Sequence, residues 1–234
     1  MKLKALSMTL CAALLLSSCG SWKNTGWGAG IGTAAGAAIG LGIGHLAGNK
    51  TVGTAVGAAV GATAGTLIGR KMDKAAEAAK QVEGAQVQEI TDVNGLPAVK
   101  VTFDSGILFG FNSTKLSDEA KSSLTAFAEV LKSTPDADVA ILGHTDNVGT
   151  EKANQSVSEK ANQSVSEKRA KAVADHLKEQ GVEGKQLKDV LGMNFSQPIA
   201  SNDTEEGRAQ NRRVEVYMYA SQAMIEAAEA EAAK

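Results

Sequence analysis

The hydrophobic and polar positions of the chain form three successive patterns. The first is a mainly apolar run from Ala5 to Leu16, preceded by Lys2 and Lys4. A run of about a dozen residues is too short for a membrane-spanning helix, which needs about 20. A basic start, a short apolar run and small residues after it are typical of a secretory signal. We therefore expect residues 1–18 to be a signal peptide.

The second pattern is a glycine at every fourth position within residues 26–70. The first series is Gly28, Gly32, Gly36, Gly40, Gly44 and Gly48, and the second is Gly53, Gly57, Gly61, Gly65 and Gly69. The stretch between Gly48 and Gly53 is polar and has the composition of a turn. The spacing predicts two antiparallel helices of about five turns each, joined by that turn.

A membrane would explain so many glycines in helices. Glycine costs about 1 kcal/mol relative to alanine in a solvated helix, whereas rows of small residues let helices approach closely in lipid. Apart from His45, neither helix carries an ionisable group. We expect residues 26–70 to form a glycine-zipper hairpin that inserts in a membrane or oligomerises at one. A flexible Ala/Gly linker is the alternative, because alanine and glycine contribute little to insertion.

Two alanine-rich, charged segments lie at the borders of the remaining pattern. Residues 71–85 read as a solvent-exposed helical spacer that follows the basic exit at Arg70 and Lys71. Residues 221–234 read as an Ala/Glu helix with no clear apolar face. We expect the first to be a spacer and the second an exposed tail.

The third pattern, over residues 86–220, alternates short strands with amphipathic helices. Strands are expected at 86–93 and 99–103, joined by an Asn94-Gly95 turn, and at 139–143, 187–191 and 214–219. One helix begins after the N-cap Ser117 and buries Ala120, Leu124, Phe127, Ala128 and Leu131; another ends near Gly181. Strands separated by helices predict an α/β sandwich, with one sheet and helices on one face.

Charge and cysteine content exclude several classes of protein. The net charge is −2, and it becomes −4 once Lys2 and Lys4 are removed, so no basic face for nucleic acid is expected. Of the two cysteines, Cys11 lies in the segment to be removed, which leaves no disulfide framework. The histidines lack metal-ligand spacing, and no Ser-His-Asp order stands out. We expect neither a metal, nor a cofactor, nor catalysis.

The end of the apolar run reads Leu16-Ser17-Ser18-Cys19, which resembles the bacterial lipobox. The resemblance implies that Cys19 is acylated and that residues 19–25 are a lipidated tether. Acyl chains anchor firmly, because each buried methylene contributes about 0.8 kcal/mol. Gly20 stands where some bacteria use an aspartate to retain lipoproteins at the inner membrane, so we expect the periplasmic face of the outer membrane. An ordinary signal peptide that contains a cysteine is the alternative.

Several motifs occur in one order along the C-terminal half. They are Phe111-Asn112, then Gly143 to Asn147 (Gly-His-Thr-Asp-Asn), Arg169-Ala170, and Gly207 to Glu215 (Gly-Arg-Ala-Gln-Asn-Arg-Arg-Val-Glu). With them, residues 97–220 resemble the peptidoglycan-binding domain at the C-terminus of outer-membrane protein A, the OmpA-like family. The resemblance implies a two-layer α/β sandwich of βαβαββ type.

The family's ligand is the stem peptide of the cell wall, especially its diaminopimelate residue, whose free end carries an ammonium and a carboxylate. The resemblance implies that Asp146 binds the ammonium and Arg169 the carboxylate, to which a guanidinium fork pairs two-fold. Asn112, Thr145 and Arg212 are weaker candidates. Independently of the family, Arg169 emerges from an apolar stripe of Val165, Val173 and Leu177, and arginine is seldom buried unpaired. A structural pair with Asp146, or a side chain that reaches water, is the alternative.

The family spacing is interrupted between the acid and the arginine. The octad Lys152–Glu159 is repeated at once as Lys160–Glu167. In the family the two site residues lie fifteen positions apart, and here Arg169 comes eight positions later. A lengthened helix would add about 12 Å and rotate the faces by about 80°. Because the repeat is polar, we predict that the second copy keeps the helical register and the first is extruded as a loop or splayed turn.

Together these patterns predict a lipid-anchored envelope protein that connects the outer membrane to the cell wall without a covalent bond. The alternative is a glycine-zipper oligomer or pore-like structural protein in which the C-terminal domain is only a tether. A homo-oligomer through the zipper is compatible with both.

Overall fold

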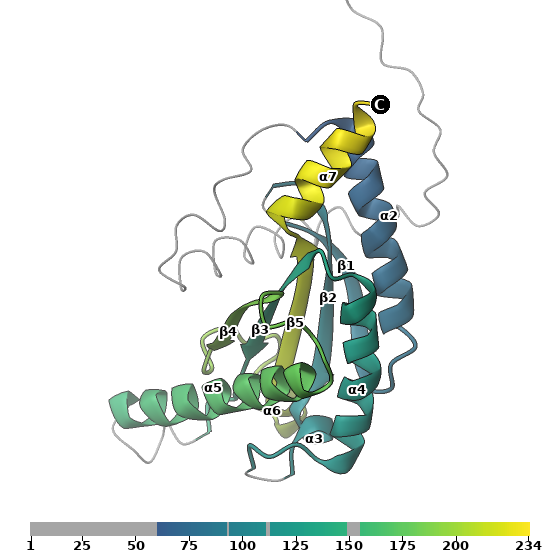
Figure 1. Ribbon diagram of the computed structural model, residues 1–234. Helices are drawn as coiled ribbons and strands as arrows, with labels where there is room; N and C mark the ends of the chain where they lie inside the picture. The colour runs from purple at the N-terminus through teal and green to yellow at the C-terminus, as the bar shows by residue number, and fades with distance from the viewer. Residues whose placement is uncertain (1–59, 93, 111–112, 149–154) are drawn as a thin grey trace, which may run out of the picture.

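The computed structural model describes residues 60–92, 94–110, 113–148 and 155–234 (Figure 1). The predicted signal peptide, the tether with Cys19 and most of the glycine-zipper hairpin therefore lie outside the described residues. In the described part, no helix is long and apolar enough to span a bilayer.

The centre of the fold is a five-stranded sheet. Its strands are β1 (Ala85–Thr91), β2 (Pro97–Asp104), β3 (Ala137–Gly143), β4 (Leu187–Gly192) and β5 (Arg213–Ala220). Their spatial order is β1-β2-β5-β3-β4, so the last strand in the chain inserts between β2 and β3. Only the pair β3 and β4 is parallel. A parallel pair requires a crossover, which here contains a long helix.

The first two strands form the hairpin that the Asn94-Gly95 pair predicts. Thr91 pairs with Pro97 at the end of the ladder, and Gly95 has a φ of +79°. Asp92 Oδ1 accepts hydrogen bonds of 2.8 Å from the amides of Asn94 and Leu96. The left-handed backbone explains the glycine, since a side chain there would be strained.

Helices cover one face of the sheet, as expected. They are α2 (Ala62–Ala79), α3 (Ser105–Leu108), α4 (Asp118–Ser133), α5 (Gln155–Glu179), α6 (Glu205–Asn211) and α7 (Gln222–Ala232). The main core joins Val99, Val101, Phe103, Ile141, Val216 and Met218 of the strands to the buried sides of α2, α4, α5 and α7. The five residues predicted to line α4 are all fully buried. The α/β sandwich prediction is confirmed.

Helix α2 differs from the predicted exposed spacer. It runs without a break through Gly69 and Arg70, where we expected one element to end and another to begin. Ile68 and Met72 are fully buried, as are the small residues Ala75, Ala76 and Ala79 (at most 1% exposed), and the helix packs on β1 and β2. The alanines that suggested a solvated spacer instead let the helix lie close to the sheet.

The C-terminal helix α7 is also not the exposed tail that we expected. Its Met224, Ile225 and Ala228 are buried, and it packs beside α2 (Figure 1). Ser221 caps it, since its Oγ accepts from the amide of Met224 at 3.1 Å. The buried face of α7 consists of only three residues, which is too few to stand out in the sequence. Its role is clear only in the structure, where α2 packs against it.

Candidate functional site

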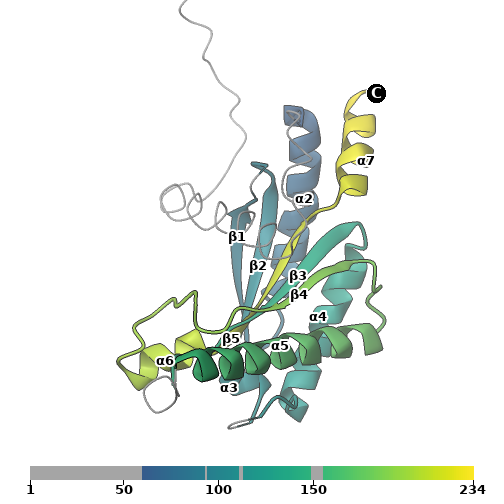
Figure 2. The same cartoon turned by 90° about the vertical axis from the view of Figure 1, so that its left-hand side faces the viewer.

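The duplicated octad lies in α5, which is one continuous helix from Gln155 to Glu179 (Figure 2). The second copy is entirely helical and leads directly into Arg169, as predicted. The first copy differs from the prediction, because from Gln155 onward it adds turns to the same helix. Lys152, Ala153 and Asn154 lie outside the described residues.

Two glycines determine the register of α5. A Cβ on Gly143, at the end of β3, would meet the carbonyl oxygen of Ser166 at 2.2 Å, and one on Gly192, at the end of β4, would meet Ser166 Oγ at 2.5 Å. These two glycines are paired in the ladder, so both strand ends contact the helix at one point. Ser166 Oγ also accepts from the amide of Asn194 at 3.1 Å. The register is therefore held at Ser166, in the second copy.

The added octad extends α5 away from the site, so it does not rotate Arg169. The extension from Gln163 back to Gln155 is about 12 Å long. A lengthened helix would move the arginine away from the acid only if the added turns lay between Ser166 and Arg169, and here they lie before Ser166.

Asp146 follows β3 in a segment fixed by backbone hydrogen bonds. The amide of His144 donates to the carbonyl of Arg213, and that of Thr145 to the carbonyl of Asn194, both at 2.8 Å. Asp146 is 7% exposed. Its Oδ1 accepts from the amide of Val148 at 3.0 Å. The carboxylate is therefore held in one orientation at the end of the strand.

The ion pair of Asp146 is with Arg212, between α6 and β5. Arg212 Nη1 lies 2.6 Å from Asp146 Oδ2, and Nη2 lies 2.8 Å from Glu205 Oε1. Partial burial alone would lower the pKa of Arg212, but its hydrogen bonds to Asp146 and Glu205 outweigh it and raise that pKa. The hydrogen bond from Arg212 lowers the pKa of Glu205. Asp146 therefore carries a fully charged partner.

Arg169 is 8% exposed and forms no ion pair with any described acidic residue. Its Nε and Nη2 donate to the carbonyl of Ser113 at 3.3 and 3.2 Å, and its guanidinium carbon lies 5.2 Å from the centre of the Phe109 ring. Burial is the largest cause that lowers the pKa of Arg169, followed by the charge of Arg212; Asp146 acts in the opposite direction. A buried cation thus lies in the electrostatic field of Asp146 without pairing with it.

The candidate residues are partly brought together. Asp146, Arg169 and Arg212 interact in one region, and Thr145 precedes the acid. Thr145 Oγ1 is buried and has no hydrogen-bond partner in the described structure. Asn112 lies outside the described residues. Sequence reasoning missed Ser113 and Phe109 as the contacts of Arg169. Both lie close to the Phe111-Asn112 motif in the sequence, but nothing local linked them to α5.

Comparison with known proteins identifies the region that carries this site. Residues 108–212 match the model of the OmpA family, and residues 1–73 match that of the YMGG-like Gly-zipper. The C-terminal region is an OmpA-family domain. The second match overlaps the first part of α2, up to Asp73.

Relatives of the OmpA-family domain occur within longer proteins. The chain is 42% identical over 119 residues to peptidoglycan-binding protein ArfA of Mycobacterium tuberculosis, covering 51% of this chain and 34% of ArfA. It is 36% identical over 112 residues to outer-membrane lipoprotein YfiB of Pseudomonas aeruginosa, covering 48% of this chain and 61% of YfiB. The chain therefore spans less than two thirds of either relative.

A solved structure supports the fold alone. The crystal structure of a MotB-like protein from Desulfovibrio vulgaris superposes with a TM-score of 0.52 at 22% identity, covering 68% of this chain and 92% of that one. The coverage exceeds the OmpA-family match, which is consistent with elements outside residues 108–212 packing on the domain.

Behind the site, the OmpA-family domain buries a charged cluster on the other face of the sheet. Glu215 is 2% exposed and contacts Arg213 Nε at 2.8 Å, Lys100 Nζ at 2.9 Å and the Tyr217 hydroxyl at 2.6 Å. Burial alone would raise the pKa of Glu215, but the hydrogen bond with His144 and the charges of Arg213 and Lys100 hold that pKa far below its usual value. Glu215 lies on β5, which pairs with both β2 and β3. The cluster therefore helps to fix β5 in the middle of the sheet.

His144 lies beside this cluster and is 1% exposed, with Nε2 3.4 Å from Glu215 Oε2. Burial lowers its pKa, so it is neutral at pH 7. Among the described residues, no group of three His, Cys, Asp or Glu side chains could hold a metal ion. His144 therefore acts as a packed residue at a strand end.

Proposed function

We propose that the chain binds peptidoglycan non-covalently through the diaminopimelate residue of a stem peptide, and so tethers the outer membrane to the cell wall. The observation that carries this proposal is the buried, unpaired Arg169. A buried charge is costly unless it is paired. A ligand carboxylate would supply the missing anion.

The local geometry fits a zwitterion. The Nε and Nη2 groups of Arg169 share one carbonyl acceptor, and Nη1 has no hydrogen-bond partner among the described residues. Among the described residues, the carboxylate of Asp146 makes one contact from each oxygen, although each oxygen can accept more than one hydrogen bond. In the proposed complex, Arg169 binds the ligand carboxylate and Asp146 binds the ammonium.

Arg212 has a supporting role in this proposal. It orients Asp146 and is itself held by Glu205. Thr145 and Asn112 are proposed to add hydrogen bonds to the ligand, with Thr145 depending on a small movement that exposes its hydroxyl. The name of the relative ArfA, a peptidoglycan-binding protein, supports this ligand class.

The anchoring half of the proposal concerns Cys19, which we propose is acylated. The lipobox-like sequence supports it, and so does the relative YfiB, an outer-membrane lipoprotein. Radiolabelled palmitate should be incorporated into the wild-type chain and not into Cys19→Ser. Equal labelling of both would contradict the anchor without affecting the cell-wall site.

The match of residues 1–73 to a glycine-zipper family favours a second candidate function, a membrane oligomer with the domain as its tether. Cross-linking in native membranes separates the two. A ladder of homo-oligomers that disappears on replacing zipper glycines with leucine supports the second candidate, and a monomer supports the simple tether.

Retention on insoluble peptidoglycan tests the site directly. We expect Arg169→Ala and Asp146→Ala each to lose at least about tenfold in affinity, the scale of one hydrogen bond to a charged group. Lys171→Ala is the matched control, because Lys171 is an exposed cation on the same helix that pairs with Asp175. Retention of all variants equal to wild type would overturn the assignment.

A further inference from the structure

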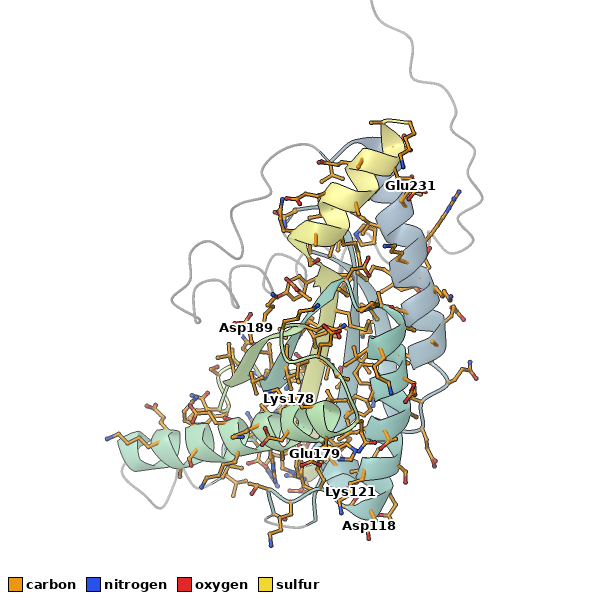
Figure 3. All side chains as sticks on the ribbon, viewed as in Figure 1. Asp118, Lys121, Lys178, Glu179, Asp189 and Glu231 are labelled. Atoms are coloured by element: carbon orange, nitrogen blue, oxygen red, sulfur yellow. The ribbon has the colours of Figure 1, made fainter. Side chains whose placement is uncertain are left out.

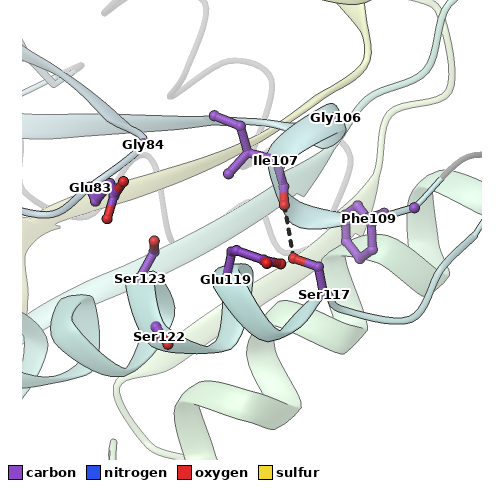
Figure 4. A pocket seen from close by; sticks show the side chains of 10 residues that line it. Glu83, Gly84, Gly106, Ile107, Phe109, Ser117, Glu119, Ser122 and Ser123 are labelled. Atoms are coloured by element: carbon purple, nitrogen blue, oxygen red, sulfur yellow. Dashed lines mark hydrogen bonds between the residues drawn. The ribbon is translucent and has the colours of Figure 1, made fainter.

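A hollow of about 710 Å³ lies on the side of the fold where the turn before β1, helix α3 and the first turns of α4 meet (Figure 4). Phe109 forms part of its wall and also contacts the guanidinium of Arg169, so the hollow adjoins the site described above without including it. Nothing in the peptidoglycan proposal uses this hollow.

Two exposed carboxylates line the hollow from different parts of the chain. Glu83 precedes β1, and Glu119 lies in the first turn of α4. A carboxylate at the position of Glu119 is stabilised by the dipole of α4, whatever its function. Glu83 is not at the start of a helix, so the dipole does not explain its carboxylate. Neither has an ion pair among the described residues; Lys121, a cation on the same helix as Glu119, pairs with Asp118 at 2.9 Å (Figure 3).

Ser123 gives a second, independent indication of a ligand. Its side chain belongs to a residue only 8% exposed, it makes no hydrogen bond within the described structure, and its hydroxyl points into the hollow toward Glu83 (Figure 4). By contrast, Ser117 is already used, since its hydroxyl donates to the carbonyl of Ile107 at 3.1 Å. The Ser123 hydroxyl is therefore free to accept a hydrogen bond from a molecule in the hollow.

The remaining wall is apolar. Ile107 is 42% exposed, although it is a large aliphatic residue, and it lies against Gly84. Gly84 has a φ of +75°, and a Cβ there would meet the methyl groups of Ile107 at 3.4 Å. Gly84 therefore lets the backbone pass close to Ile107 at the rim of the hollow.

We propose that this hollow binds an aliphatic primary ammonium group. Glu83 and Glu119 accept the hydrogen bonds of the ammonium, the Ser123 hydroxyl accepts a third, and Ile107 contacts the carbon chain. An ammonium has three donors and no acceptor, which matches a lining with two carboxylates and a free hydroxyl. The ligand is either a free diamine or a lysine-type side chain of a peptide, since both present the same group.

Nuclear magnetic resonance titration of the full chain tests the proposal. The probes are cadaverine, its neutral isostere 1,5-pentanediol, and Nα-acetyl-lysine amide. We expect cadaverine or the lysine amide to shift the amides of Gly84 and Gly106 saturably, and pentanediol to leave them unchanged. Tighter binding of the diamine indicates a free amine as the ligand, and tighter binding of the lysine amide indicates a peptide.

Variants keep the test specific. Glu83→Gln combined with Glu119→Gln should weaken binding about tenfold or more, because charge-assisted hydrogen bonds are lost. Glu129→Gln, which removes one negative charge on the far part of α4, should leave binding unchanged. An equal effect of both variants, or equal shifts with pentanediol, would overturn the proposal. Arg169→Ala should retain cadaverine binding, so failure here is distinguishable from failure of the peptidoglycan site.

Discussion

Asp146 and Arg212 form a 2.6 Å ion pair across 66 positions of sequence, and no acid of the described residues pairs with the buried Arg169. Three charged groups therefore share a small region with only one of the two cations directly paired. This arrangement is the basis of the proposed anion site, because removing a charge from water is costly unless it is compensated.

Replacing Arg169 with methionine should separate function from stability. Arg169→Met keeps a long apolar stem and removes the unpaired charge, so we expect a melting temperature equal to or above that of wild type. Binding to peptidoglycan should nevertheless be lost. Calorimetry and the retention assay measure the two effects, and a large drop in melting temperature would indicate that Arg169 is mainly structural.

Removing the partner of Asp146 should destabilise the fold moderately. Arg212→Ala leaves a largely buried carboxylate without its cation; since Arg212 is about one-third exposed, we expect a loss of about 1–2 kcal/mol rather than the 3–5 of a fully buried pair. Urea unfolding provides the value. Arg208→Ala, which loses a contact with Glu205 but none with Asp146, is the control and should cost less.

Deleting one octad should change little. Because the register of α5 is held at Ser166, removal of Lys152–Glu159 shortens the projecting end of the helix and leaves Arg169 in place. We expect unchanged peptidoglycan retention and a melting temperature within a few degrees of wild type. A folded variant that no longer binds would mean that the first copy contributes to the site.

Two glycine substitutions should have opposite effects. Gly143→Ala introduces a Cβ 2.2 Å from a backbone oxygen of Ser166, so we expect a loss of about 1–3 kcal/mol or more. Gly65→Ala meets nothing within 4 Å and lies inside α2, so it should stabilise by up to about 1 kcal/mol. Denaturant unfolding compares them directly, and equal effects would contradict the packing described.

The buried Glu215 predicts sensitivity to acid. Its folded pKa is lowered, so its ionised form contributes stability above its ordinary pKa of 4.5, and that contribution is lost as pH falls. Glu215→Gln should cost about 3–5 kcal/mol at pH 7. It should also flatten the dependence of stability on pH between 5 and 3. Urea unfolding at pH 7, 5 and 3 tests this, with the exposed Glu206→Gln as the control.

Local patterns predicted much of the domain. Each strand and the helix after Ser117 appear close to the predicted residues, and α5 ends at Glu179, near the predicted end at Gly181. Such elements are predictable because a period of two or of nearly four is a property of neighbouring positions. The spacer and the tail were misjudged for the same reason. Ala75, Ala76 and Ala79 face the sheet, and Met224, Ile225 and Ala228 face α2, but a short run of small residues does not reveal its partner.

The sequence by itself determined the strand and helix pattern, the hairpin at Asn94-Gly95, and the family motifs that single out Asp146 and Arg169. Only the tertiary structure decided that Asp146 pairs with Arg212, that Arg169 rests on Ser113 and Phe109, and that the octad lengthens α5 outward. The physical reason is that these contacts join segments far apart in the chain. Their partners are selected by packing around the sheet, which no single segment encodes.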